Sequence, residues 1–99
     1  MNVEIRDGDQ IWKVESERPI CIGTAEICDI VLPRADFLEL GRQELALEEA
    51  NGALRILSLH PEHETLVDGK PVAQEGMQLA PGTYSIAVDG RTFMLVFGL

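Results

Sequence analysis

Apolar and polar residues alternate over short segments of this chain, and turn-forming dipeptides separate the segments. The dipeptides are Gly8-Asp9, Asn51-Gly52, Asp68-Gly69, Pro81-Gly82 and Asp89-Gly90. Short alternating segments between such dipeptides are typical of antiparallel strands joined by tight hairpins. The pattern therefore predicts an all-β chain folded as a sandwich or a barrel.

Three of these turns also predict which residues face each other, because a two-residue hairpin fixes the register of its strands. The predicted pairs are Ile86 with Phe93, Tyr84 with Leu95, Leu47 with Ile56, Glu48 with Arg55, Ile5 with Trp12, Val3 with Val14 and Glu4 with Lys13. Each pair joins apolar side chains or opposite charges and contributes roughly 0.2–1 kcal/mol. Agreement across three hairpins supports the β prediction.

The segment 36–50 is the one stretch rich in helix-forming residues, and Asp36 is a candidate helix cap. Gly41 interrupts this segment, and the leucines that follow alternate instead of repeating every 3.6 residues. We expect a strand over Glu44–Glu49. A helical turn between Asp36 and Gln43 is kept as an alternative.

Four sequence motifs come in a defined order along the chain. They are Gly23 followed by Asp29-Ile30-Val31-Leu32-Pro33, then Gly41-Arg42-Gln43-Glu44, then Thr65-Leu66-Val67-Asp68-Gly69, and finally Leu79-Ala80-Pro81-Gly82 before the last hairpin. Over roughly residues 3–97, this order resembles the motif order of forkhead-associated (FHA) domains, which bind phosphothreonine. The resemblance implies an FHA-like antiparallel β-sandwich of about ten or eleven short strands in two sheets.

The residues that hold the phosphate in that family are replaced here. The family arginine, serine and asparagine correspond to Thr24, Gly41 and His63, and Glu44 stands in place of the family histidine. Phosphate recognition needs cationic or hydrogen-bond donors that converge on a dianion. The resemblance, with these replacements, implies a phosphate-independent protein–protein docking or scaffolding module.

The contact surface is expected on the loops 24–26, 34–42 and 60–65. The candidate partner-binding residues are Thr24, Arg34, Arg42, His60, His63 and Thr65. Two alternatives remain open. One is a phosphothreonine-peptide-binding FHA signalling module whose non-standard pocket uses the two arginines. The other is an architectural module that self-associates into a ring.

Degenerate FHA domains of this kind are similar to the cytoplasmic domain of YscD-type subunits, which form the inner-membrane ring of type III secretion systems. This resemblance implies a protein-transport role and a cytoplasmic location as part of a single-pass inner-membrane protein, with the anchor beyond Leu99. It also implies protein partners among cytoplasmic secretion-platform components, and a ring oligomer of the full-length protein.

Length and charge narrow the picture further. The 99 residues predict a single FHA-like domain, 1–99, with its own core. Seventeen acidic residues against eight basic ones leave a net charge of −9, which disfavours binding to nucleic acid or to an anionic membrane surface. We therefore expect a protein partner, no nucleic acid and no direct membrane contact by this domain.

Candidate chemistry is sparse. Cys21, Cys28, His60 and His63 could be combined into a Cys₂His₂ metal set, but six residues separate the cysteines where zinc sites use two to four. We expect buried free thiols, no metal and no cofactor. No nucleophile motif or phosphate-binding loop is present, so the chain is not expected to be an enzyme. A pH-sensitive contact through the two histidines remains a hypothesis.

Overall fold

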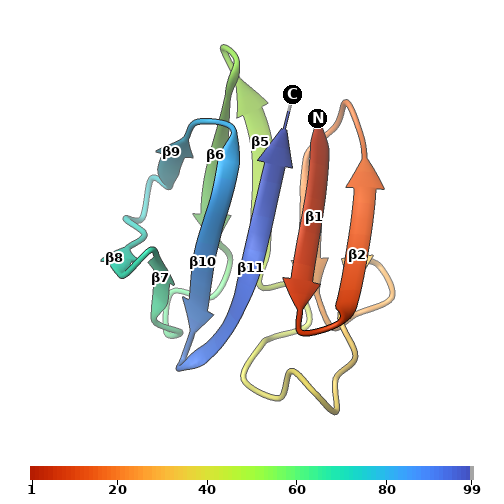
Figure 1. Ribbon diagram of the computed structural model, residues 1–99. Helices are drawn as coiled ribbons and strands as arrows, with labels where there is room; N and C mark the ends of the chain where they lie inside the picture. Colours follow the sequence, from red (N-terminus) through yellow and green to blue (C-terminus); the bar gives the residue numbers. More distant parts are fainter. Residues whose placement is uncertain (99) are drawn as a thin grey trace.

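The computed structural model describes residues 1–98, which form eleven strands in two packed sheets (Figure 1). The strands are β1 (Asn2–Asp7), β2 (Gln10–Glu15), β3 (Ile20–Gly23), β4 (Ile30–Val31), β5 (Leu45–Ala50), β6 (Ala53–Ser58), β7 (Thr65–Val67), β8 (Lys70–Pro71), β9 (Met77–Leu79), β10 (Gly82–Val88) and β11 (Arg91–Gly98). Within residues 1–98, no helix is long and apolar enough to span a bilayer. The predicted two-sheet sandwich of ten or eleven strands is confirmed.

The sheets have the strand orders β2-β1-β11-β10-β7-β8 and β4-β3-β5-β6-β9. All paired strands are antiparallel except β3 and β4, which run parallel; this departs from the expected antiparallel arrangement. The loop after β3 brings the chain back to the same sheet edge, where Ile30 pairs with Ile22 and both side chains are buried. Hydrogen bonds between Cys21 and Asp29 hold this return in place.

The hairpin registers agree with the sequence prediction at all seven pairs. The strand expected over Glu44–Glu49 lies one residue later, at Leu45–Ala50. At the last hairpin, Asp89 and Gly90 both have positive φ angles, 47° and 86°. Positive φ at both turn positions is the conformation that matches the right-handed twist of the flanking strands.

The segment 36–43 forms turns and no helix, so the helical alternative was wrong. A tertiary contact determines its path. Phe37 is fully buried and makes edge-to-face contacts with Trp12 and Phe93, at ring-centroid distances of 5.8 and 5.9 Å. The guanidinium of Arg91 lies 4.2 Å from the Phe37 ring centroid. Burial of the phenyl ring, about 1.5–3 kcal/mol, outweighs the helix propensity of the neighbouring residues.

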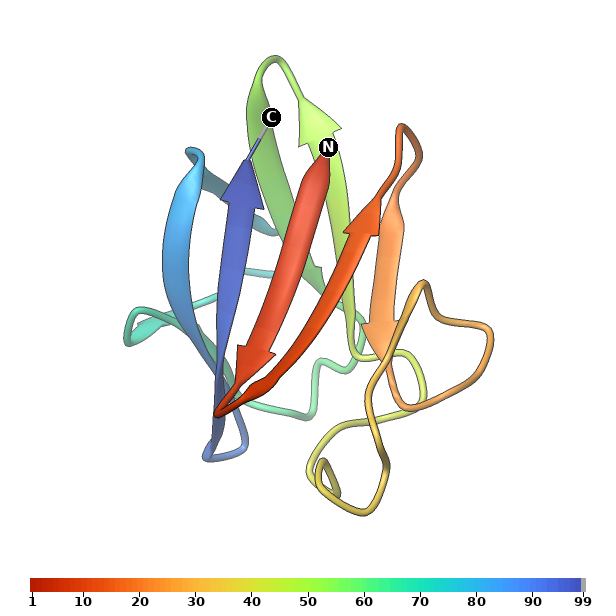
Figure 2. The same cartoon turned by 45° about the vertical axis from the view of Figure 1, so that its right-hand side comes forward.

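The core between the sheets is mainly aliphatic. Ile5, Ile22, Leu47, Ile56 and Ile86 are all fully buried there. Asn2 pairs with Gly98 at one end of the sandwich, and the long loops after β3 and β4 extend from the other end (Figure 2). The two sheets thus form a rigid support for these loops.

Candidate functional site

Three loops meet at one end of the sandwich: β3–β4 (24–29), β4–β5 (32–44) and β6–β7 (59–64). The Ala25 N–H donates to the Arg42 carbonyl at 3.0 Å, and the Thr24 N–H and hydroxyl both donate to the Gly41 carbonyl at 3.3 Å. These bonds join the first two loops through their backbones. The third loop is joined to them by side chains.

The side chain of Glu44 links the β4–β5 loop to the β6–β7 loop. Its side chain is fully buried. Its Oε1 atom accepts a hydrogen bond from the Gly41 N–H at 2.7 Å and contacts His63 Nδ1 at 2.8 Å. Its Oε2 atom has no hydrogen-bond partner among the described residues. Because a buried carboxylate is costly unless it is paired, His63 is a structural partner of Glu44.

The surroundings of His63 favour its protonated form. The hydrogen bond to Glu44 raises the pKa of His63, and the negative charges of Glu44, Asp89 and Glu62 act in the same direction, while partial burial opposes them. Asp89 Oδ2 lies 4.0 Å from His63 Nε2. The histidine is thus surrounded by carboxylates.

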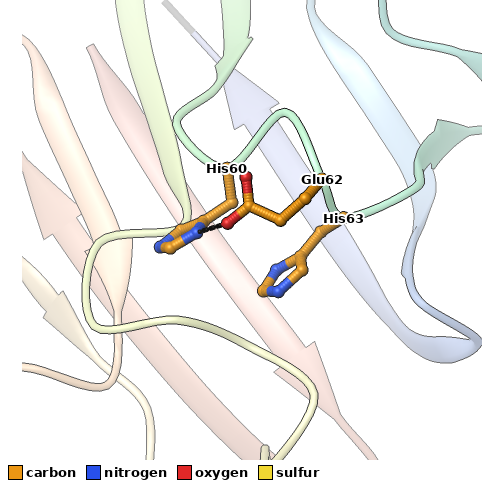
Figure 3. A group of neighbouring side chains, drawn as sticks. All are labelled: His60, Glu62 and His63. Carbon is orange, nitrogen blue, oxygen red and sulfur yellow. Dashed lines mark hydrogen bonds and ion pairs between the residues drawn. The ribbon is translucent and has the colours of Figure 1, made fainter.

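His60 stacks on His63, with ring centroids 4.8 Å apart and an interplanar angle of 14°. Figure 3 shows His60 Nδ1 contacting the Glu62 carboxylate, at 2.7 Å. The Nε2 edge of the His60 ring lies against Gly41. A Cβ atom added at Gly41 would be only 2.3 Å from His60 Nε2. The imidazole therefore occupies the space that any side chain at position 41 would need.

The departures from the FHA motifs thus belong to one cluster. Glu44 and His63, which replace the family histidine and asparagine, contact each other. Gly41, which replaces the serine, gives room to His60. From sequence alone these replacements are separate losses of donors. In the structure they form a new set of contacts.

Five of the six predicted site residues lie on the joined loops, and four of these, Thr24, Arg42, His60 and His63, take part in the loop contacts or line the pocket beside them. Arg34 is exposed in a turn of the β4–β5 loop, and no polar side-chain contact connects it to them among the described residues.

Thr65 is 5% exposed at the start of β7, and its hydroxyl has no hydrogen-bond partner among residues 1–98. It lines a cavity of about 320 Å³ together with His63. Its side chain therefore lies below the surface formed by the joined loops.

A shallow pocket of about 550 Å³ opens beside the histidines. Its lining residues are Ala25, Ile27, Arg42, Gln43, Leu59 and His60. Ile27 and Leu59 are 76% and 43% exposed, and Arg42 is also exposed. Exposed apolar side chains around a concave surface are typical of a protein-binding site.

The cysteines are free, as predicted, but only Cys28 is buried, while Cys21 is half-buried. Their sulfur atoms lie 3.0 Å apart, and the Cys28 thiol donates to the Arg42 carbonyl at 3.1 Å. Burial, together with the contact with Cys28, raises the pKa of Cys21 to about 12. Because the thiolate is the reactive form, we assign these cysteines to loop packing.

The sequence candidates did not include the acidic residues of the site, Glu44, Glu62 and Asp89, or the exposed pocket residues Ile27 and Leu59. From the sequence, Glu44 is only the replacement of the family histidine, whereas in the structure it is buried and paired. One sequence signal for this pair was available. Glu44 stands in place of the family histidine, and a histidine, His63, stands in place of the family asparagine. Asp89 reaches the site only through the sheet pairing of β10 with β7.

No family model matches this chain, and no curated protein sequence matches it. Solved structures of FHA domains are similar to it over nearly its whole length. An FHA domain described in a study of phosphothreonine-dependent interactions has 20% identity and a TM-score of 0.74, with 100% of this chain and 99% of that chain covered. The FHA domain of the CT664 protein from Chlamydia trachomatis has 17% identity and a TM-score of 0.73, with 99% and 97% covered.

The FHA domain of FhaA, solved in complex with the intracellular domain of Rv3910, has 22% identity and a TM-score of 0.73, with 97% of this chain and 98% of that chain covered. The three similarities establish that this chain has the fold of an FHA domain.

Proposed function

We propose that residues 1–99 form one docking domain, without enzymatic activity, that binds a protein partner through its three joined loops and does not require phosphate. One observation carries this proposal. At each of the three family phosphate positions, one hydrogen-bond donor is already used inside the chain. The Thr24 hydroxyl donates to a carbonyl, the Gly41 N–H donates to Glu44, and His63 Nδ1 contacts the same carboxylate.

Charge supports the same proposal. A phosphate dianion on these loops would lie near the carboxylates of Glu44, Glu62 and Asp89, which surround His63. The phosphate and these carboxylates carry charges of the same sign and would repel each other. The repulsion is stronger at partly buried positions, where water screens less. Arg42 is an exposed cation in the pocket that His60 also lines.

The pocket indicates what the partner offers instead. Ile27 and Leu59 provide exposed apolar area, and Arg42 provides an exposed guanidinium. An apolar side chain of the partner fits between the two aliphatic residues, with a carboxylate placed to pair with the arginine. Interfaces combine an apolar centre with a polar rim in this way.

We also propose the finer assignment that the motif resemblance implies. In it, the domain is the cytoplasmic part of a YscD-type inner-membrane ring protein of a type III secretion system. Its partners are components of the cytoplasmic secretion platform, and the full-length protein forms the ring. The support for this assignment is the degenerate FHA motif set of the sequence, together with the donors used internally.

The test is a binding assay with a partner identified by cross-linking in the source cells and then purified. We expect Ile27→Asp to weaken binding by at least about tenfold, a typical cost for a central interface residue. Ile11→Asp is the matched control, because Ile11 is also exposed, at 52%, but lies on β2. Phosphatase treatment of the partner should leave the affinity unchanged. Loss of binding after that treatment would support the phosphothreonine-reading alternative.

A further inference from the structure

The short turn His60-Pro61-Glu62-His63 gathers three side chains of the kinds that bind metal ions. His60, Glu62 and His63 each offer one ligand atom, and these atoms lie within 4.8 Å of one another (Figure 3). The His63 N–H closes the turn on the His60 carbonyl at 3.0 Å. Proline at the second position of such a turn has the required φ. The local sequence thus holds both imidazoles on one side.

Glu44 orients His63 for ligation. With the Nδ1 proton donated to the buried Glu44 carboxylate, His63 Nε2 remains free to bind a metal. A carboxylate behind a histidine in this way fixes the ring and increases the basicity of its ligand nitrogen. Because Glu44 is fully buried and also bound to the Gly41 N–H, this support is rigid.

The cluster has more acidic groups than basic ones. Its carboxylates are Glu44, Glu62 and Asp89, and its only cationic groups are the two imidazoles when they are protonated. The Glu44 Oε2 atom is buried without a hydrogen-bond partner among the described residues. A buried carboxylate oxygen without a partner is an independent sign of uncompensated negative charge. A divalent cation on the histidines would compensate it.

We propose that His60, Glu62 and His63 bind a divalent transition-metal ion, with Zn²⁺ as the best match, and that water completes the coordination. Two imidazole nitrogens and a carboxylate oxygen form a ligand set that suits zinc. Tetrahedral zinc with bonds of about 2.0–2.1 Å separates its ligand atoms by about 3.3 Å. Rotation of the exposed Glu62 and the one-third exposed His60 side chain can close the present spacing. This site does not depend on the proposed docking function.

The test is calorimetric titration of the EDTA-treated and desalted 99-residue protein with ZnCl₂. We expect one saturable site. His60→Gln, Glu62→Gln and His63→Gln should each weaken Zn²⁺ binding by at least about 10-fold, the lower range for a perturbed metal site. Glu26→Gln is the matched control, because Glu26 is an exposed acid on the neighbouring β3–β4 loop. Its affinity should equal that of the wild type.

Two further measurements keep the test decisive. His63→Gln also loses the contact with Glu44, so the exposed Glu62→Gln variant decides the result if His63→Gln does not fold. The imidazole ¹⁵N resonances of His60 and His63 should shift with Zn²⁺ and remain unchanged with Mg²⁺. Absence of saturable binding, or equal binding by all variants as expected for adventitious contact with an acidic surface, would overturn the proposal.

Discussion

Replacement of Glu44 by glutamine tests the buried contact that distinguishes these loops. Glutamine keeps the size of the side chain and can still accept a hydrogen bond from the Gly41 N–H. It removes the negative charge that both the 2.7 Å bond from Gly41 and the 2.8 Å contact with His63 depend on. The neighbouring strand residue Glu49 is exposed, so Glu49→Gln is the same chemical change without a buried contact.

The expected magnitude follows from the two contacts. Hydrogen bonds to charged groups contribute about 1.5–3 kcal/mol, against about 0.5–1.5 kcal/mol for neutral ones. Replacing both charged contacts by neutral ones should therefore lower the free energy of unfolding by roughly 2–3 kcal/mol. This is a large part of the 5–15 kcal/mol by which a domain is typically stable. At about 4–8 °C for each kcal/mol in a domain of this size, the melting temperature should fall by roughly 10–20 °C.

Urea unfolding monitored by the fluorescence of Trp12 measures this change, because Trp12 packs against the buried Phe37. Glu49→Gln should change the free energy of unfolding by less than about 0.5 kcal/mol. A double-mutant cycle with His63→Gln should give a coupling of about 1–2 kcal/mol, within the usual range for residues in contact. A Glu44→Gln variant as stable as the Glu49→Gln control, or a cycle without coupling, would refute the reasoning.

Three further predictions concern the same cluster and the neighbouring thiol. Gly41→Ser should cost about 1–3 kcal/mol through overpacking against His60, and much less in a His60→Ala background; equal costs in urea unfolding would contradict the close packing. With EDTA present, the stabilisation from the Glu44 contact is complete below the ordinary histidine pKa of about 6.5 and is lost as the pH rises through the raised pKa of His63. Wild-type stability in urea should therefore fall more steeply than that of His63→Gln as the pH rises above the ordinary histidine pKa of about 6.5; parallel curves would disprove this linkage. Cys21, with its pKa raised from 9.0 to about 12, should react with a thiol reagent at pH 8 roughly 1,000-fold more slowly in the folded protein than in urea, and equal rates would show that the thiol is not shielded.

Most of the fold could be predicted because it depends on hairpin turns between strands that are adjacent in the sequence. The hairpin turns fix the register of β1–β2, β5–β6 and β10–β11, and every pair predicted from them is present. The parallel pairing of β3 with β4 and the path of the segment 36–43 could not be predicted in this way. Both depend on contacts between residues distant in sequence, such as Phe37 with Phe93.

The site was only partly predictable for the same reason. The motif positions identified Thr24, Gly41 and His63 as places where phosphate donors are missing. Sequence spacing does not show that Glu44 points inward or that His60 fills the space above Gly41. Burial makes Glu44 a structural partner of His63, a role that its motif position alone does not indicate.

The phosphate independence of the domain is tested most directly by direct titration with peptides. Fluorescence anisotropy should be measured with a phosphothreonine peptide library and with the same peptides unphosphorylated. We predict that phosphorylation does not tighten binding to any peptide, because Glu44, Glu62 and Asp89 surround His63 with negative charge. Micromolar binding that requires the phosphate and is lost in Arg42→Ala would contradict the central proposal.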